Sequence, residues 1–499
     1  MKRKNRKRDI NKLSTNVGGG LKKEGKMEFK RMDKEALEKL APYFNNQTTR
    51  MSVYSIAYQI MWNEEMFMPE YTITNDNLVF KGTNKGKTVF FYPISQTGKY
   101  TDEEKAVCEI ENYCRKEYCG LTYLNVPKEK LGYLCSRYTD VRMSNERTWD
   151  DYLYKVEEFK SFSGKKFSGQ RNHVNKFYKN YPNAEFKVYK KEEEGKLLAF
   201  LDEYKDNYFH KETGIAKKEL LKTKDLIPHI ERYKLCCGFM EIDNKIVSVA
   251  IGEICGDTLI EHVEKANNGY EGIYPATAQA FVRKFAGERT IYLNREDDAG
   301  DLGLRKSKLQ YNPCGLVRKY MLEVEKPLKK IKKCPVIKTD RLIIKKMEEK
   351  DKEAYFKLAS DTERNKWWGY DYREILKGKE PDADLFMNVV KQDFLNRDEM
   401  SLGIYLKEEL IGETVLHNCG YRGETEVGVR LLKEYEGKGY ARETVCGMIE
   451  FAFTAMVSSE VQAKCFKENI QSRRMLEGAG MRYCGEDEKF YYFYKNAKM

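Results

Sequence analysis

The sequence predicts a mixed α/β protein with several domains. Runs of alternating apolar residues, which are typical of strands, are separated by stretches in which apolar residues recur at helical spacing. The chain has 499 residues, which exceeds one ordinary core and indicates about three domains. Hydrophobic residues make up 41% of the chain and charged residues 34%, a balance typical of a folded protein rather than a disordered one.

The clearest local pattern lies in residues 426–455. A β-rich stretch, residues 426–432, is followed by a turn that contains Gly437 and Gly439, and then by apolar residues at helical spacing. Glycines let a loop turn its N–H groups inward, and a helix N-terminus adds partial positive charge. The pattern predicts a pyrophosphate socket, although an isolated Gly-x-Gly is also compatible with a plain strand-to-helix turn.

Residues 27–160 are expected to form one mixed α/β module in which no motif indicates chemistry. Its expected helices span residues 33–40, 45–62 and 103–116, and its expected strands span residues 71–74, 78–80, 88–92 and 122–126.

Residues 161–327 are expected to form a second module that repeats the pattern of residues 426–455. A basic helix over 165–177 precedes the expected strands, which span residues 238–242, 245–253, 259–267 and 290–294. The segment Tyr-Glu-Gly-Ile-Tyr-Pro-Ala, residues 270–276, aligns with Tyr-Glu-Gly-Lys-Gly-Tyr-Ala, residues 435–441, which indicates an internal repeat. The upstream copy lacks the second glycine, and Pro275 has no N–H to offer a phosphate. We therefore expect it to be a poor coenzyme A socket.

A dense polar cluster distinguishes the upstream copy. Two interpretations stay open: a buried ion-pair network that holds the loop, or a binding site for an acyl or aminoacyl donor or for the acceptor. The candidate ligand-binding residues are Glu264, Lys265, Asn267, Tyr274, Asn294, Arg295, Asp297 and Asp298.

Charge and cysteine content limit the remaining possibilities. Residues 1–26 contain ten basic and two acidic residues and so carry +8 of the net charge of +12, which predicts a disordered tail or a non-specific RNA tether. The thirteen cysteines are scattered and the five histidines are far apart, so we expect reduced thiols and no metal. No apolar run approaches bilayer-spanning length and no signal peptide is evident, so we expect no membrane insertion and a cytoplasmic protein.

The C-terminal third resembles the GNAT acyltransferase superfamily, in particular its ribosomal-protein N-acetyltransferase branch, from about Ile337 to Tyr494. The resemblance rests on the strand Thr339–Ile344, the glycine loop, Asn469 with Ser472, and the Leu-Glu-x-x-Gly of residues 476–480. It implies acetyl-CoA as donor and Glu426 and Ser472 as catalytic residues, Glu426 as general base and Ser472 beside the leaving sulfur. The implied coenzyme-binding residues are Val429, Arg430, Leu431, Gly437, Lys438, Gly439, Tyr440, Ala441, Arg442 and Asn469. The carboxylate of Glu436, close to the expected phosphates, departs from the family pattern.

The expected acceptor site of this module lies in residues 365–372. Indoles and phenols beside a carboxylate suit a cationic amine, so the candidate substrate residues are Trp367, Trp368, Tyr370 and Asp371. A core tryptophan with surface neighbours is the alternative.

Residues 27–325 resemble the C-terminal domain of bacterial phosphatidylglycerol lysyltransferases, a tandem of two GNAT-like modules. The resemblance rests on Glu-Lys-Ala-Asn (264–267), Gly-Ile-Tyr-Pro (272–275), Asn-Arg-Glu-Asp-Asp (294–298) and the helix with Arg-Asn-His-Val-Asn-Lys-Phe (171–177). The expected fold is thus three GNAT-like modules, each a mostly antiparallel sheet flanked by helices. The expected domains span 27–327, with modules 27–160 and 161–327, and 337–499, joined by a lysine-rich linker at 328–336.

The expected function is acetyl transfer to a primary amine of a small molecule, peptide or protein, with an N-terminal domain that binds or modifies a related substrate. Two alternatives are an aminoacyl-tRNA-dependent aminoacyltransferase in the N-terminal domain, for which aminoacyl-tRNA is the partner, and an acyl-CoA sensor without turnover.

Overall fold

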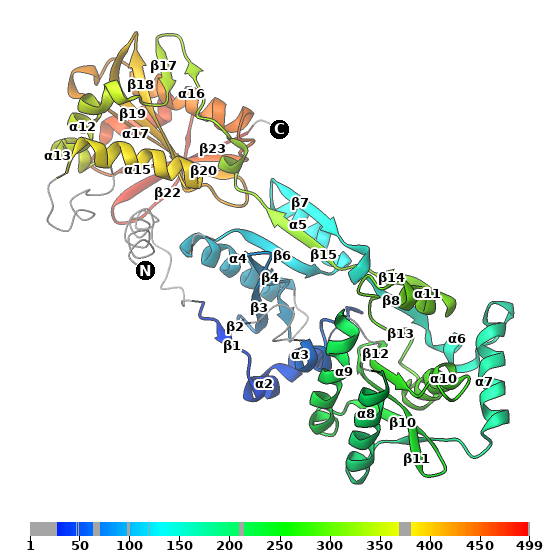
Figure 1. Cartoon of the computed structure of the whole chain (residues 1–499). Helices are drawn as coiled ribbons and strands as arrows, with labels where there is room; N and C mark the ends of the chain where they lie inside the picture. Colours follow the sequence, from blue (N-terminus) through cyan, green and yellow to red (C-terminus); the bar gives the residue numbers. More distant parts are fainter. Residues whose placement is uncertain are drawn as a thin grey trace. The chain divides into compact units, whose positions relative to one another are not determined.

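The computed structural model of the protein describes residues 27–497, apart from residues 46, 48, 63–69, 97–99, 118, 209–213 and 369–380. In this part of the chain, three β-sheets form, and helices flank each of them (Figure 1). One compact unit consists of residues 27–131 and 143–323, and the other consists of residues 132–142 and those from 324 onward. The expected mixed α/β fold is confirmed, while the expected tail lies outside the described residues.

The first sheet has the strand order β1-β2-β3-β4-β6-β15-β7, with β5 paired to β3. Its strands are β1 (Lys30–Arg31), β2 (Glu70–Thr74), β3 (Asn77–Asn84), β4 (Lys87–Phe91), β5 (Ile94–Ser95), β6 (Leu121–Val126), β7 (Val141–Asn145) and β15 (Tyr320–Val324). The helices in this part of the sequence are α2 (Lys34–Asn45), α3 (Ile56–Trp62), α4 (Tyr100–Lys116) and α5 (Leu131–Arg137). A two-residue turn with positive φ at Asn75 and Asp76 joins β2 to β3, as the sequence predicts for a tight hairpin.

The helix expected over residues 45–62 is wrong in its first half, because α3 begins only at Ile56. The backbone N–H of Ser52 donates to the Asp151 carboxylate at 2.8 Å, which holds the preceding turn out of helical geometry. The Glu253 carboxylate then accepts the N–H groups of Ile56 and Ala57 and caps α3. Both carboxylates are distant in sequence, so local spacing could not reveal this start.

The second sheet has the order β14-β8-β13-β12-β11-β10-β9. Its strands are β8 (Asp151–Lys155), β9 (Glu185–Val188), β10 (Cys236–Ile242), β11 (Lys245–Cys255), β12 (Thr258–Ala266), β13 (Tyr292–Asn294) and β14 (Gly315–Val317). The helices are α6 (Val156–Ser161), α7 (Ser168–Asn180), α8 (Glu194–Tyr208), α9 (Gly214–Leu226), α10 (Ile273–Phe285) and α11 (Leu302–Gln310). Strand β8 belongs to this sheet although it precedes residue 160, and β15 returns to the first sheet.

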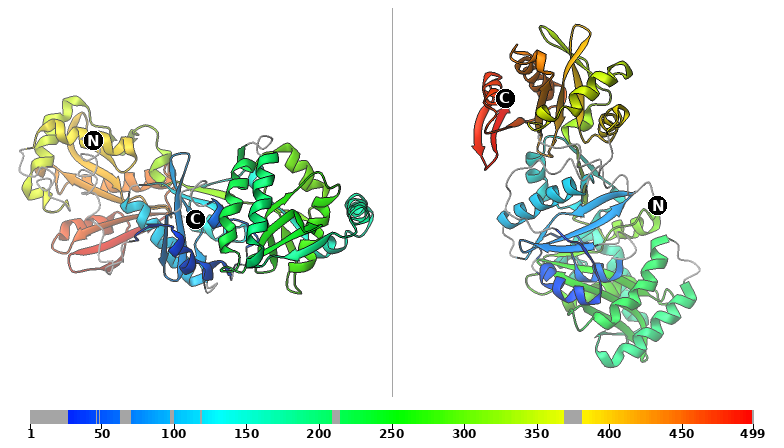
Figure 2. Two further views of the ribbon diagram at one scale, coloured as in Figure 1. Left: turned by 60° about the horizontal axis from the view of Figure 1, so that its bottom comes forward. Right: turned by 90° about the vertical axis from the view of Figure 1, so that its left-hand side faces the viewer.

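Helices cover both faces of the second sheet because consecutive residues of its central strands are buried, which places apolar side chains on each face. Val249 and Ile251 of β11 pack in one core with Leu197 of α8, whereas Ala250 packs in another core with Phe281 of α10. Figure 2 shows the green helices of this part of the chain flanking its strands. The sheet is therefore buried on both sides, which fixes its register.

The third sheet has the order β16-β17-β18-β19-β20-β21-β23-β22. Its strands are β16 (Ile337–Lys338), β17 (Leu342–Lys345), β18 (Met400–Leu406), β19 (Glu409–His417), β20 (Glu424–Leu431), β21 (Glu460–Phe466), β22 (Arg482–Glu486) and β23 (Phe490–Asn496). The helices are α12 (Lys352–Ser360), α13 (Thr362–Asn365), α15 (Ala383–Asn396), α16 (Tyr440–Thr454) and α17 (Ile470–Gly478). The β20–β21 pair is parallel, whereas the other strand pairs of this sheet are antiparallel in the described part of the chain.

Helix α16 buries the apolar stripe that the sequence predicts. Val445, Met448, Ile449 and Ala452 pack in one core with residues of β18 to β21. Helices α12 and α15 contribute a second core with Tyr405 and Leu410. Among the described residues, we find no helix with the length and apolar character that crossing a bilayer requires.

Candidate active site

The third sheet opens between its two parallel strands. Strands β20 and β21 pair at only three positions, of which the last joins Glu426 to Gln462. On its other side, β20 stays paired with β19 as far as Leu431. Within the described part of the chain, residues 427–431 therefore present a backbone edge that no second strand pairs with, and a pocket lies beside residues 427–429. Its lining includes Val427, Gly428 and Val429 of β20, Lys464 and Cys465 of β21, Trp367, Trp368, His417, Glu426, Asn469 and Ser472.

The glycine loop at the start of α16 is exposed and open. Gly437 and Gly439 have φ values of 71° and 83°, which favour glycine, and a Cβ on Gly437 would meet nothing within 4 Å. No side chain caps α16, so the first amide groups of this helix remain donors for an anion. Lys438 and Arg442 are exposed beside these donors. The predicted pyrophosphate socket is thus compatible with the geometry.

Two charged groups near the loop are engaged with protein partners. Glu436, the departure from the family pattern, pairs with Arg364 at 2.7 Å, so a guanidinium compensates its charge. Arg341 donates to the Lys438 carbonyl at 3.1 Å and pairs with Glu443 at 2.7 Å. Sequence analysis missed Arg341, which lies about 100 residues before the loop it supports.

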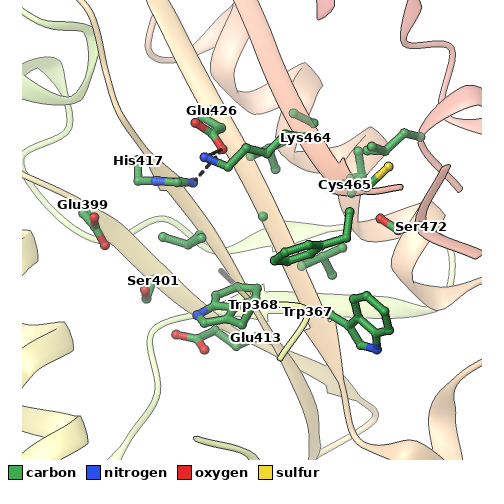
Figure 3. Close-up of a pocket in the computed structure, with 18 of the residues that line it drawn as sticks. Trp367, Trp368, Glu399, Ser401, Glu413, His417, Glu426, Lys464, Cys465 and Ser472 are labelled. Atoms are coloured by element: carbon green, nitrogen blue, oxygen red, sulfur yellow. Dashed lines mark ion pairs between the residues drawn. The ribbon is translucent and has the colours of Figure 1, made fainter. Parts of the chain in front are cut away.

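Glu426, the predicted general base, has three polar neighbours in the pocket. Its carboxylate accepts from the Asn418 side chain at 2.8 Å and lies 3.4 Å from the Lys464 ammonium. The Nε2 atom of His417 lies 3.6 Å from the same carboxylate, because His417 and Glu426 are register partners on β19 and β20. Figure 3 shows these three ionisable side chains together, with Cys465 and Ser472 on one side and Glu399 and Ser401 on the other.

His417 is a neutral base in this setting. Burial lowers its pKa below the ordinary value of 6.5, Glu426 opposes that effect, and Lys464 adds to it. Its side chain is still 17% exposed and lines the pocket, so a ring nitrogen can reach a bound molecule. Sequence analysis did not select His417, because only the β19–β20 register places it opposite Glu426.

Asn469 and Ser472 both line the pocket and lie at the start of α17. Asn469 is the N-cap of α17, and its side chain accepts from the Ser472 backbone N–H at 3.0 Å. The Ser472 side chain is hydrogen-bonded to the Cys465 thiol. Burial raises the pKa of this thiol to about 11, although the contact with Ser472 opposes the effect. The Cys465 thiol therefore stays protonated at neutral pH, beside a hydroxyl that can act as a donor.

The two indoles expected at the acceptor site are in the pocket wall. Trp367 meets Phe466 edge-to-face at 5.6 Å, and the Arg430 guanidinium lies 4.4 Å from the Trp368 ring centroid. Arg430 also pairs with Glu413 at 2.5 Å. The side chain of Arg430 thus positions Trp368, in addition to the backbone role that the sequence predicts. Tyr370 and Asp371 lie outside the described residues.

Carboxyl groups gather at one end of the pocket. Asp393 of α15, Asp398 and Glu399 line it together with Glu413. Burial and, to a smaller extent, the neighbouring carboxylates Asp393, Asp398, Glu413 and Glu426 together raise the pKa of Glu399 to about 8. Burial and Asp398 likewise raise the pKa of Asp393 to about 6. Sequence analysis missed this group, because it forms only when the end of α15 meets β18.

The polar cluster of the second sheet is largely paired within itself. The parallel pairing of β12 with β13 ends at Ile260 and Asn294, where β13 itself ends. Beside the rest of β12, Arg295 pairs with Glu261 at 2.8 Å and with Glu264. Lys265 pairs with Glu219 at 2.5 Å. Asp297 pairs with Lys319, Asp298 with Arg305, and Asn294 donates to Asp151. The Tyr274 hydroxyl donates to the Ala266 carbonyl and the Asn267 side chain accepts from Gly269.

One oxygen of this cluster is left without a hydrogen-bond partner, the buried Oε1 of Glu264. Burial raises the pKa of Glu264 to about 8, although Arg295 opposes that effect. The ion-pair interpretation accounts for most of the cluster, and the ligand interpretation stays a prediction that rests on this carboxyl group.

A buried histidine links two carboxylates beside the end of β13. The His262 ring lies 3.0 Å from Glu253 through Nε2 and 2.7 Å from Glu296 through Nδ1. Burial alone would lower the pKa of His262, but these hydrogen bonds outweigh it and raise the pKa to about 10. An imidazolium therefore ties the capping carboxylate of α3 to the end of β13.

The upstream glycine loop is covered, unlike the downstream one. Gly272 caps α10 with a φ of 85°, and a Cβ there would lie 2.3 Å from the His173 carbonyl of α7. The start of α10 is therefore packed against protein rather than open to an anion. This agrees with the expectation of a poor coenzyme A socket.

Among the described residues, we find no group of three or more histidine, cysteine or acidic side chains that could hold a metal ion.

Two known protein families match the chain, one over the first two sheets and the other over the third. Residues 45–323 match the family "Phosphatidylglycerol lysyltransferase, C-terminal", and residues 341–482 match the "Acetyltransferase (GNAT) domain" family. The chain belongs to the phosphatidylglycerol lysyltransferase C-terminal family. Its last third is a GNAT domain, so both resemblances are confirmed.

Individual relatives match one part each. The uncharacterized N-acetyltransferase YnaD of Bacillus subtilis is 33% identical over 148 residues, 29% of this chain and 82% of the relative. The uncharacterized N-acetyltransferase YoaA of the same organism is 25% identical over 161 residues, 32% of this chain and 89% of the relative. A conserved protein of unknown function from Bacteroides thetaiotaomicron shares the fold over 60% of this chain and 100% of its own, with a TM-score of 0.54 and 24% identity. The two N-acetyltransferase relatives and the GNAT family match support an acyltransferase.

The lysyltransferase-like part should lose stability in alkaline solution through His262. Its folded pKa of about 10 exceeds the unfolded value of about 6.5, so its contribution is fully present below pH 6.5 and is lost as pH rises through 10. Calorimetry of the full chain should show the N-terminal unit weakening over this window. The His262→Gln variant should be less stable at pH 7 and have a flatter pH dependence; an unchanged slope would contradict the assignment.

Packing at Gly272 should make this position intolerant of a side chain. Gly272→Ala and Gly86→Ala both place alanine at a positive φ, but only Gly272 faces a carbonyl oxygen at contact distance. Gly272→Ala should lower the free energy of unfolding by about 1–3 kcal/mol more than Gly86→Ala. Equal losses in chemical denaturation would show that α7 does not cover this loop.

Proposed function

We propose that the GNAT domain transfers an acetyl group from acetyl-CoA to a primary amine of a small molecule, peptide or protein. The observation that carries this proposal is the unpaired edge of β20, which leads along the chain to the open amide groups at the start of α16 and lines a pocket with its residues 427–429. An extended amide-bearing arm that ends in a pyrophosphate fits such an edge and socket.

Each chain element has a distinct binding task in this proposal. The backbone of Val429, Arg430 and Leu431 aligns the pantetheine arm as an added strand. The amide groups from Gly437 to Arg442 donate hydrogen bonds to the pyrophosphate oxygens, and Lys438 and Arg442 add charge-assisted contacts. Acetyl-CoA would supply the activated thioester.

Proton removal from the amine falls to His417 together with Glu426. An attacking amine must be neutral, and a neutral imidazole has the lone pair that accepts its proton. Glu426 lies 3.6 Å from Nε2 and stabilises the imidazolium that results. The base that the sequence predicts is thus one half of a pair, in which Lys464 and Asn418 hold the carboxylate.

In this proposal, Ser472 and Asn469 contact the leaving group, which is the sulfur of coenzyme A and its pantetheine arm. The Ser472 hydroxyl lies at the start of α17, where it can donate to the departing sulfur. Asn469 uses its side-chain oxygen as a cap, which leaves its amide N–H groups to contact the pantetheine. Trp367 and Trp368 form the wall along which the acceptor would enter.

For the lysyltransferase-like part we propose binding or modification of a related substrate. Aminoacyl-tRNA-dependent transfer there remains the second candidate, favoured by the exposed lysines of the short 3-10 helix Lys165–Phe167 and of α7, together with His173 of α7. Loss of activity on ribonuclease treatment of the full chain would support it. An acyl-CoA sensor is the third possibility, and the kinetic experiment below separates it from an enzyme.

Calorimetric titration of acetyl-CoA into the full chain tests the donor site. A carboxylate at position 437 would point into the socket and repel the phosphates, and Asp and Asn both tolerate its positive φ. Gly437→Asp should weaken acetyl-CoA binding at least about tenfold more than the uncharged Gly437→Asn. Equal affinities of the two variants, or no heat from the unaltered chain, would overturn the proposal.

Acetylation kinetics test the proton acceptor. His417→Gln and Glu426→Gln should each lower kcat by about 10²–10⁴-fold with little change in acetyl-CoA affinity. With His417 present, activity should fall as pH drops through its lowered pKa, below 6.5, because the protonated ring cannot accept a proton. His417→Gln should lack this acidic limb.

His173→Gln, an exposed histidine of α7, serves as the control and should behave as the unaltered chain. Acetyl-CoA binding without turnover on any amine would favour the sensor.

A further inference from the structure

Two of the carboxyl groups that gather at one end of the pocket have no cation paired with them among the described residues. The side chains of Asp393 and Glu399 have no ion pair or hydrogen bond within the described part of the chain. Asp398 is partly compensated, because Lys326 and Lys329 oppose the effect of burial on its pKa. The carboxyl groups without a compensating cation are thus those of Asp393 and Glu399.

The cations of the surrounding wall are already engaged. Arg430 pairs with Glu413 and donates to Asn365 at 2.6 Å. Lys464 lies 3.4 Å from Glu426. Arg397, which immediately precedes Asp398, donates instead to the carbonyls of Phe394 and Lys332. The residue best placed in sequence to neutralise the acids therefore turns away from them.

Helix stabilisation does not account for these acids either. Asp393 lies in the last turn of α15, where the helix dipole disfavours negative charge, and no basic residue occupies that turn. Carboxyl groups that are partly desolvated, close together and at a helix C-terminus are costly unless a ligand compensates them. Since they line the pocket and not a sealed core, the compensating cation can come from a bound molecule.

We propose that this end of the pocket binds a second cationic group of the acceptor, so that the preferred substrate is an amine with two separated positive charges. The ammonium at one end pairs with Glu399 and Asp393, while the nitrogen at the other end reaches His417 and Glu426. Figure 3 shows Glu399 on the side of His417 that faces away from Ser472. An amine anchored at Glu399 thus extends toward the side of the pocket where the thioester would lie.

This inference rests on the proposed acetyltransferase function and specifies its substrate class. The amine that reacts loses one proton and gains an acetyl group as the C–S bond of the thioester breaks and coenzyme A leaves as the thiol. The anchored ammonium takes no part in bond making and contributes only orientation.

Matched amines test the inference on the full chain. Acetylation of 1,4-diaminobutane and 1,6-diaminohexane should exceed that of n-butylamine and n-hexylamine by about tenfold or more in kcat/KM. Glu399→Gln should reduce this ratio toward one, whereas Glu408→Gln, which removes the same charge from the exposed β18–β19 turn, should preserve it. Equal kcat/KM for each diamine and its monoamine would overturn the inference and leave the acetyltransferase function standing.

Calorimetry gives a second readout that does not need turnover. Diamine binding to the coenzyme A-saturated chain at pH 7 should release protons, because an ammonium beside Glu399 lowers a pKa of about 8. The heat should then depend on the ionisation enthalpy of the buffer, and Glu399→Gln should lose this dependence. Absence of diamine heat overturns the inference, whereas absence of heat from acetyl-CoA overturns the proposed function itself.

Discussion

The early end of pairing between β20 and β21 is the constraint on which the candidate site depends. Two parallel strands that stayed paired to their ends would satisfy each other's backbone groups and leave no room between them. Here the pairing stops at Glu426. Gly428 has no side chain, and a Cβ at this position would lie 3.4 Å from the Trp368 ring, so the ring can pack closely against the strand. The same break creates the unpaired edge, the pocket and the position of Glu426 at its rim.

In the second sheet, β12 also continues beyond its parallel partner, because β13 ends at Asn294, but the outcome differs. Beside the rest of β12, Arg295 pairs with Glu261 and Glu264, and His262 lies between Glu253 and Glu296. Buried charges of this kind stabilise a structure only when each has a close partner. The chain thus contains two related arrangements. In the third sheet, a pocket lies beside the unpaired strand edge and the start of α16 is exposed; in the second sheet, ion pairs occupy the corresponding place and the start of α10 is covered by α7.

Electrostatics divide the open pocket into two regions. Around Glu426 the charges are balanced, because Lys464 and Asn418 hold the carboxylate and His417 is neutral. Around Glu399 they are not balanced, and burial raises the pKa of the carboxyl groups instead. Ionisable groups with shifted pKa values and no partner are common at binding and catalytic sites, because burying them in a core without a ligand would destabilise the fold.

The sequence by itself determined the fold class, the glycine loop, the helix behind it and the place of Glu426, Asn469 and Ser472 in one pocket. These features follow from local periodicity, glycine geometry and a motif whose members lie within about fifty residues, which is what a family resemblance records. Only the tertiary structure decided which groups surround them. His417 meets Glu426 through strand register, Arg430 meets Glu413 and Trp368 across the sheet, and Glu399 meets Asp393 where α15 joins β18. The start of α3 at Ile56 likewise depends on Glu253, about 200 residues away. Pairings between distant segments depend on packing and burial rather than on local spacing, and for that reason the sequence predicted the reacting loop better than the walls of its pocket.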